Sequence, residues 1–176
     1  MIMRYFSLSV VMLAAALLVA SCSNKVSQKD VKKAEAALFN ADKTTNEDAV
    51  ANAISTFSAF AEDNPDDASA PEYLFKALEV SVNTHQEPQA SIDLMERLVT
   101  NYPDFDKNPV AMFMVATFIY DEQLGDLEKA RATYQRIIDK YPNNAFARDA
   151  AIAIEQLGIS PDDLVKMFEA QDTIGQ

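Results

Sequence analysis

Apolar residues after position 27 recur every three or four positions, which is the period of an amphipathic helix. Alternating β-branched runs bounded by tight turns, the usual signal of strands, are missing from this sequence. The pattern therefore predicts an all-α domain. Its eight expected helices span 30–41, 46–63, 71–84, 88–101, 108–122, 126–141, 144–157 and 160–170.

Two of these helices have recognisable starts. Asn46 stands where an N-cap is expected, directly before an apolar-periodic run. The last helix opens with Ser160 as cap, Pro161 at the first helical position and Asp163 three residues after the cap. We expect Leu164, Val165 and Phe168 of this helix to cover the open end of the fold.

Three helices end in the same way. Pro65, Pro103 and Pro142 follow them at separations of 103 − 65 = 38 and 142 − 103 = 39 residues. Counting back from each proline gives one shared order of small, large and large residues, on a single helical stripe. The three sets are Ala53, Phe57 and Phe60; Ser91, Met95 and Leu98; Ala130, Tyr134 and Ile137. A period in this range is typical of stacked helix pairs.

The segment FMVATFIYDEQLGDLEKARATYQRIIDKYP, residues 113–142, resembles a tetratricopeptide repeat. Thr117 stands where the family usually has glycine, and one extra residue precedes Gly125. The residues that fit the family are Phe113, Ala116, Tyr120, Gly125, Asp126, Ala130, Tyr134 and Pro142. A weaker repeat contains Leu74, Ala77 and Leu78. The resemblance implies a tetratricopeptide-like helical repeat array over 28–170, of about three helix pairs plus a C-terminal capping pair. The alternative is a bundle of four helix pairs without repeat character.

Arrays of this kind bind partners in a groove lined by the first helix of each pair. Val110–Tyr120 is apolar nearly all round, which predicts a buried helix whose inner face lines such a groove. The repeat register gives Glu72, Phe75, Glu79, Asn83, Met114 and Phe118 as the groove residues. A groove of aromatics and acids suits a basic or amphipathic peptide. Alternatively, Phe75, Met114 and Phe118 belong to the core, while Glu72 and Glu79 form a solvated face.

The N-terminal segment has the composition of a secretory signal. Arg4 is followed by the apolar run Leu8–Ala20, which is too short to span a bilayer, and "VASC" closes the run with the only cysteine of the chain. This sequence resembles the lipobox of bacterial lipoproteins, which implies a signal peptide over 1–21, an acylated Cys22 and a tether over 22–27. An uncleaved anchor and an ordinary buried thiol are the alternatives. We expect residues 171–176 to be a disordered tail.

The chain carries a formal net charge of −12. Residues 1–21 contain Arg4 and no acid, so the expected mature part carries −12 − 1 = −13. Such a charge repels nucleic acid, and we expect no nucleic-acid partner. "SNKV" after Cys22 lacks an adjacent aspartate. By resemblance to the enterobacterial sorting rule, this implies lipid anchoring in the bacterial outer membrane, with the domain facing the periplasm.

Motifs for catalysis or cofactors are missing from the sequence. His85 is the single histidine, and a polar turn surrounds it. Asp104, Asp106 and Asn108 begin like a calcium loop, but Pro109 and Val115 occupy the positions that need glycine and glutamate. We therefore expect no enzyme activity, no cofactor and no metal.

The sequence predicts a lipid-anchored, non-catalytic scaffold that presents its groove to an envelope protein or peptide. This combination resembles the repeat lipoprotein of the outer-membrane β-barrel assembly machine and the Tol-Pal-associated periplasmic coordinator, which implies a role in envelope assembly. The alternative function is a lipoprotein that binds sugar or peptidoglycan fragments, or hydrolyses them. The oligomeric state does not follow from the sequence.

Overall fold

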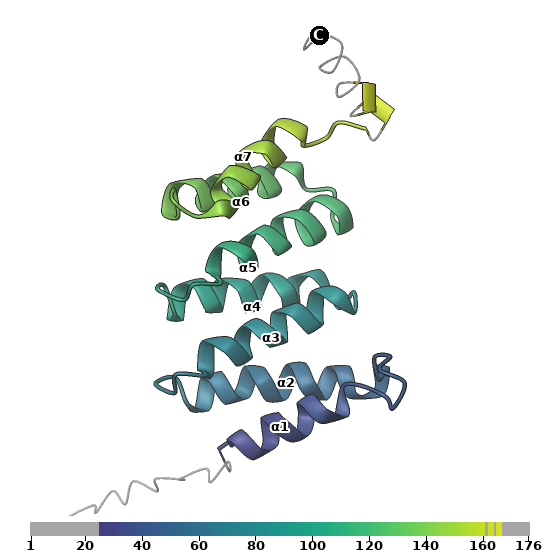
Figure 1. Cartoon of the computed structure of the whole chain (residues 1–176), viewed down its shortest axis with the longest axis vertical. Coiled ribbons are helices and arrows are strands. Elements are labelled where there is room, and N and C mark those ends of the chain that lie inside the picture. Colours follow the sequence, from purple (N-terminus) through teal and green to yellow (C-terminus); the bar gives the residue numbers. More distant parts are fainter. Residues whose placement is uncertain (1–24, 161, 164, 167–176) are drawn as a thin grey trace, which may run out of the picture.

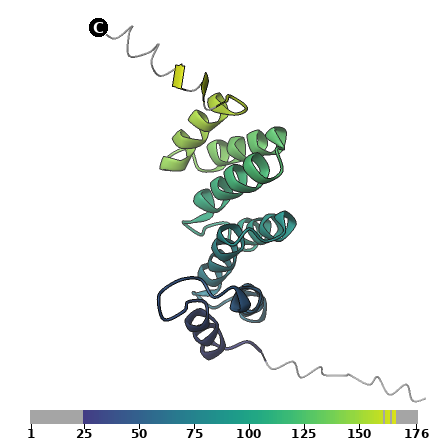
Figure 2. The same cartoon turned by 90° about the vertical axis from the view of Figure 1, so that its right-hand side faces the viewer.

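The helices of this protein stack one above another in chain order, from α1 to α7 (Figure 1). The structure is a computed structural model that describes residues 25–160, 162, 163, 165 and 166. Viewed from the side, the stack forms an elongated column (Figure 2). Its elements are α1 (Gln28–Ala37), α2 (Glu47–Asp63), α3 (Ala70–Asn83), α4 (Pro88–Asn101), α5 (Asn108–Met114), the π-helix η1 (Val115–Gln123), α6 (Leu127–Lys140) and α7 (Ala145–Gln156).

The predicted all-α repeat array is confirmed. Each bound of α2, α3, α4, α6 and α7 lies within one residue of the bound that the hydrophobic period predicts. The strongest packing runs between neighbours along the chain, α1 with α2, α2 with α3 and α6 with α7. Because each helix packs mainly on its sequence neighbours, the core is a continuous apolar layer along the stack.

The shared register of the second helices is also confirmed, since all nine residues that define it are buried. The small residues Ala53, Ser91 and Ala130 let the partner helix approach closely. The larger residues on the same stripe then fill the space between helices. Tyr134 is the largest fully buried side chain; its hydroxyl lies 2.8 Å from Oγ1 of Thr117 in the preceding helix.

The ends of the second helices are nearly identical. Asn64, Tyr102 and Tyr141 follow α2, α4 and α6 with φ values of −133°, −130° and −130°. Each donates its backbone N–H to the carbonyl four residues earlier, at 3.0, 3.0 and 2.9 Å. Proline follows each of them and disfavours the helical conformation of the residue before it. The repeated proline therefore ends each helix in the same way.

Arginines link consecutive second helices at the same register. Arg97 of α4 donates to Oγ of Ser58 in α2 at 2.6 Å. Arg136 of α6, 39 residues further on, donates to Glu96 of α4 through both terminal nitrogens, the longer contact being 3.1 Å. The contact is thus repeated from one helix pair to the next.

The expected helix over 30–41 is shorter than predicted. It ends at Ala37, and Ala41, the last residue of the predicted helix, is exposed in the loop to α2. Local polar side chains compete with the helical hydrogen bonds here. The carboxylate of Asp42 accepts from the N–H of Thr44 at 3.0 Å, and Asn46 donates its side-chain amide to the Ala37 carbonyl at 3.1 Å.

The expected α-helix over 108–122 is correct in extent but changes type. It is α-helical as α5 and continues as η1, in which hydrogen bonds reach five residues back. The same spacing ends it, with Leu124 donating its N–H to the Ile119 carbonyl at 2.9 Å. A π-helix accommodates an additional residue without breaking the helix. The π-helix thus accommodates the one extra residue that this chain has before Gly125, compared with the family pattern.

The C-terminal end of the stack differs from expectation at one residue. Ser160 and Asp163 form the predicted cap, with the Asp163 N–H donating to Oγ of Ser160 at 3.2 Å. Val165 is 55% exposed, however, so it does not cover the end of the stack. Leu164 and Phe168, the other two expected covering residues, lie outside the described residues.

We predict that Tyr134→Ala and Phe113→Ala each reduce the free energy of unfolding by about 3–5 kcal/mol, because both rings fill the core between helix pairs. Phe113 lies 5.3 Å from the Tyr134 ring and 5.5 Å from the Phe146 ring, centroid to centroid. Urea unfolding measures both losses. Tyr134→Phe is the control, because it removes only the bond to Thr117 and should cost about 1 kcal/mol. Losses below about 0.5 kcal/mol at both positions would contradict the register.

Candidate interaction face

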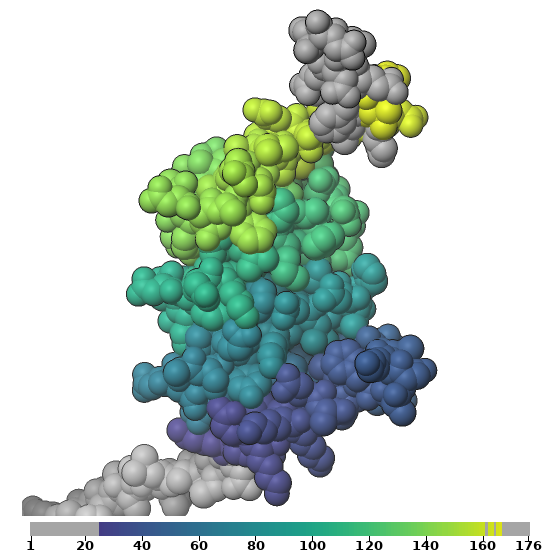
Figure 3. All heavy atoms as spheres, in the orientation of Figure 1, coloured from purple at the N-terminus to yellow at the C-terminus, as the bar shows by residue number. Residues whose placement is uncertain are grey.

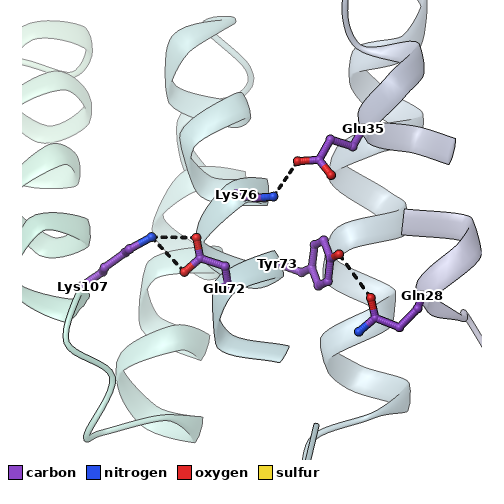
Figure 4. Close-up of polar contacts among 6 residues, drawn as sticks. All are labelled: Gln28, Glu35, Glu72, Tyr73, Lys76 and Lys107. Carbon is purple, nitrogen blue, oxygen red and sulfur yellow. Dashed lines mark hydrogen bonds and ion pairs between the residues drawn. The ribbon is translucent and has the colours of Figure 1, made fainter. Parts of the chain in front are cut away.

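The first helices of successive pairs, α1, α3 and α5 with η1, form a common side of the stack, which we call the first-helix face. Two ion pairs connect its helices (Figure 4). Lys76 of α3 lies 2.6 Å from Oε1 of Glu35 in α1, and Lys107, directly before α5, lies 2.6 Å from Oε1 of Glu72 in α3. All four side chains are partly exposed, so each pair contributes at most about 1 kcal/mol. Their main effect is to neutralise these four charges.

The charge of Lys76 is well fixed. Burial acts to lower the pKa of its ammonium group, but the hydrogen bond and charge of Glu35 outweigh burial and raise the pKa above its usual value. Lys76 therefore stays protonated and committed to Glu35.

The structure divides the six predicted groove residues. Glu72 is on the face but is occupied by Lys107. Phe75 is 4% exposed, with its ring edge against Phe105 at 6.2 Å and the Lys107 ammonium 5.1 Å from its centroid. The loop before α5 thus covers Phe75, and for this residue the core alternative holds. Met114 is half-buried and packs against the same core.

Asn83, Glu79 and Phe118 line two neighbouring recesses. The first, which we call the loop recess, has a volume of about 310 Å³ and lies between the α1–α2 loop and α3. The second, the π recess, has a volume of about 460 Å³ and lies between the end of α3 and η1. Glu79 lines the former and Phe118, which is 45% exposed, lines the latter. Asn83 lines both, so the recesses are adjacent.

Glu79 is the unusual charge of this face. Its carboxylate has no hydrogen-bond or ion-pair partner among the residues that the structure describes, unlike those of Glu35 and Glu72. Partial burial raises the pKa of Glu79, and the charge of Glu72 raises it further, against the opposing charges of Lys107 and Lys76. Glu79 is thus a partly buried carboxylate with no partner among the described residues, whereas Glu122 of the π recess, which also has none, is exposed to solvent.

Sequence reasoning missed Phe39. It is 59% exposed in the α1–α2 loop, where it lines the loop recess, whereas the helical pattern placed it inside a helix. The polar run Asn40–Asn46 was the available signal, because such residues favour turns over helix interiors. In Figure 3 this loop, in dark blue, stands out from the column.

Neither residue set considered for metals forms a site. Within the described part of the chain, no group of three or more metal-ligating side chains lies together. His85 is exposed, in a left-handed conformation with φ of 50°. Asn108 is buried, and its side-chain amide donates to the carbonyls of Tyr102 and Pro103 at 2.7 and 3.2 Å. Asn108 thus stabilises the end of α4 and the following turn.

The helix pairs, their common register and their proline-ended second helices define the protein as an all-α helical repeat array. Residues 110–144, about one repeat of the array, match the model of the tetratricopeptide repeat family, and the helix pairs of the whole array are stacked in a tetratricopeptide-like manner. The matched range contains most of α5, η1 and α6, where the sequence resemblance is best. The comparison with curated proteins found no match. Of the helices described, none is long and apolar enough to cross a membrane.

We predict that Glu79→Gln raises the melting temperature at pH 7. Burial raises the pKa of Glu79 in the folded state, so ionisation destabilises that state. With Glu79 protonated, below its ordinary pKa of 4.5, the free energy of unfolding is highest. It decreases as the pH rises through the folded-state pKa, because Glu79 then ionises in the folded protein. Thermal unfolding from pH 3.5 to 8 should therefore show the variant's advantage growing with pH. An advantage that is independent of pH would contradict this explanation.

Proposed function

We propose that this protein is a non-catalytic scaffold that binds another protein through its first-helix face. The observation that carries the proposal is the pair of adjacent recesses on that face, one with an unpaired carboxylate and one with an exposed aromatic ring. Tetratricopeptide-type arrays generally bind protein partners, and their extended surfaces suit a peptide segment better than a small substrate. The acidic chain and the free Glu79 favour a basic or amphipathic segment.

We further propose that lipidation at Cys22 anchors the scaffold in the bacterial outer membrane, facing the periplasm. Val26 is already attached to the array, since its N–H donates to Asp63 at 2.7 Å and its carbonyl accepts from Asn64 at 2.9 Å. Only four residue steps separate it from Cys22, a reach of at most about 14 Å. An acylated Cys22 would thus hold the first helix pair close to the membrane surface, with the rest of the stack extending away from it.

An envelope partner follows from this placement, and envelope assembly is the process we propose for it. The alternative function, binding or hydrolysis of sugar or peptidoglycan fragments, stays a prediction of the sequence. Calorimetry with such fragments tests it, and saturable binding would favour it over the scaffold.

We predict that the Cys22→Ser variant is not acylated. Wild-type protein expressed in a Gram-negative host should fractionate with the outer membrane, and its N-terminal peptide should carry the mass of an acylated cysteine. The variant should lack that mass and keep residues 1–21, because the acyl acceptor is missing. An unmodified Cys22 in wild-type protein would exclude the lipoprotein interpretation.

A photo-crosslinking residue at Phe118 in the protein's own cells tests the scaffold. We expect one reproducible envelope-protein adduct, identified by mass spectrometry, because Phe118 is exposed on the first-helix face. Ala132, exposed on α6, is the matched control and should give no such adduct. Equal adducts at both positions, or none at Phe118 in a folded protein, would contradict the proposed face.

A further inference from the structure

The loop between α1 and α2 is longer than the equivalent loops of the later pairs. It contains nine residues, Leu38–Asn46, against four between α3 and α4, 84–87, and three between η1 and α6, 124–126. The common repeat architecture therefore does not account for it. An extension within a regular array is where a chain-specific function is expected.

Hydrogen bonds hold this loop in a defined shape. Phe39 and Thr45 form a β-bridge. On either side of it, Asn40 donates its N–H to the Thr44 carbonyl at 2.9 Å and Asn46 donates to the Leu38 carbonyl at 2.8 Å. The Phe39 ring nevertheless stays largely exposed, so the loop presents an aromatic side chain from an ordered backbone. A preordered contact residue loses less entropy on binding.

The loop recess has a negative balance of charge. Glu35, Lys76 and Glu79 are the charged residues that line it, which gives −1 + 1 − 1 = −1. Lys76 is paired with Glu35, so the uncompensated charge belongs to Glu79. Phe39 and Val80 contribute apolar lining beside these groups.

We propose that the loop recess binds a lysine or arginine side chain of the partner's peptide segment, with Glu79 accepting from its cationic group. This inference rests on the proposed scaffold function and specifies its chemistry. Lysine and arginine combine an aliphatic stem with a terminal cation, as the apolar lining and the single free carboxylate require. The exposed face of Phe39 adds a cation–π contribution.

The size of the recess agrees with this occupant. Its volume of about 310 Å³ lies at the lower end of the range for ligand sites, which is about 300–1,000 Å³. A recess of this volume admits one long side chain together with part of the segment that carries it, whereas an acidic side chain is repelled by Glu79. The adjacent π recess, reached past Asn83, offers Phe118 to an apolar residue of the same segment.

Random twelve-residue peptides displayed on phage provide the probe. They are selected on the full chain in mild detergent, and the affinities of selected peptides are then measured for wild type, Glu79→Gln and Glu155→Gln. Glu155, exposed on α7, is the matched control because it loses the same charge away from the recess. Each selected peptide is also synthesised with glutamine at its basic position.

We expect lysine and arginine to be enriched in the selected peptides. Glu79→Gln should weaken their binding about tenfold, Glu155→Gln should leave it unchanged, and the glutamine peptide should bind both variants and wild type equally. Phe39→Ser should weaken binding of the basic peptide as well. Since we expect Glu79→Gln to be at least as stable as wild type, unfolding does not explain a loss.

Other outcomes overturn the inference in distinguishable ways. Selected peptides without basic residues, or with equal affinity for Glu79→Gln, exclude the basic occupant. If the selected peptides nevertheless fail to bind the Phe118→Ser variant, the scaffold function is retained and the π recess is the binding site. If the wild-type chain selects no peptide at all, both the occupant and the peptide-binding face are contradicted.

Discussion

The close approach of helices at Ala53, Ser91 and Ala130 is the contact on which the rest of the structure depends. Each is fully buried, so no larger side chain fits at these positions without separating the helices. Ser91 is tolerated at its buried position because its hydroxyl lies 2.8 Å from that of Ser81, and this hydrogen bond satisfies both polar groups in the core. With this spacing set, the repeated helix ends and the contacts of Arg97 and Arg136 fall into register.

A stack of this kind constrains each helix pair by its neighbours but leaves the connections free to vary. The chain departs from its own repeat mainly at two places, the long α1–α2 loop and the π-helix η1. Both departures border recesses on the first-helix face, and Asn83 lies between them. The irregular segments thus supply the surface features, Phe39 and Phe118, while the regular segments supply the rigid frame that holds them.

The sequence predicts what the hydrophobic period encodes and fails where other forces decide. Five helices and the nine register residues follow from the period and the prolines. The early end of α1 depends on hydrogen bonds of Asp42 and Asn46, and the π-helix depends on a shift of backbone bonding; neither changes the period. Phe75 and Phe118 look alike in sequence, but only Phe75 is covered, by Phe105 from a distant loop. Such a long-range contact is invisible to a helical pattern.

The state of Glu79 separates stability from function on this face. The neighbouring carboxylates of Glu35 and Glu72 each form an ion pair with a lysine, so their charges are neutralised within the fold. Glu79 lies one turn from Lys76 on α3, yet Lys76 is committed to Glu35, and the pKa of Glu79 is raised by burial. Within the described residues, Glu79 therefore contributes neither an ion pair nor a side-chain hydrogen bond to the stack. Departures of this kind from local consistency are expected at functional sites, and the buried apolar register of the stack is complete without Glu79.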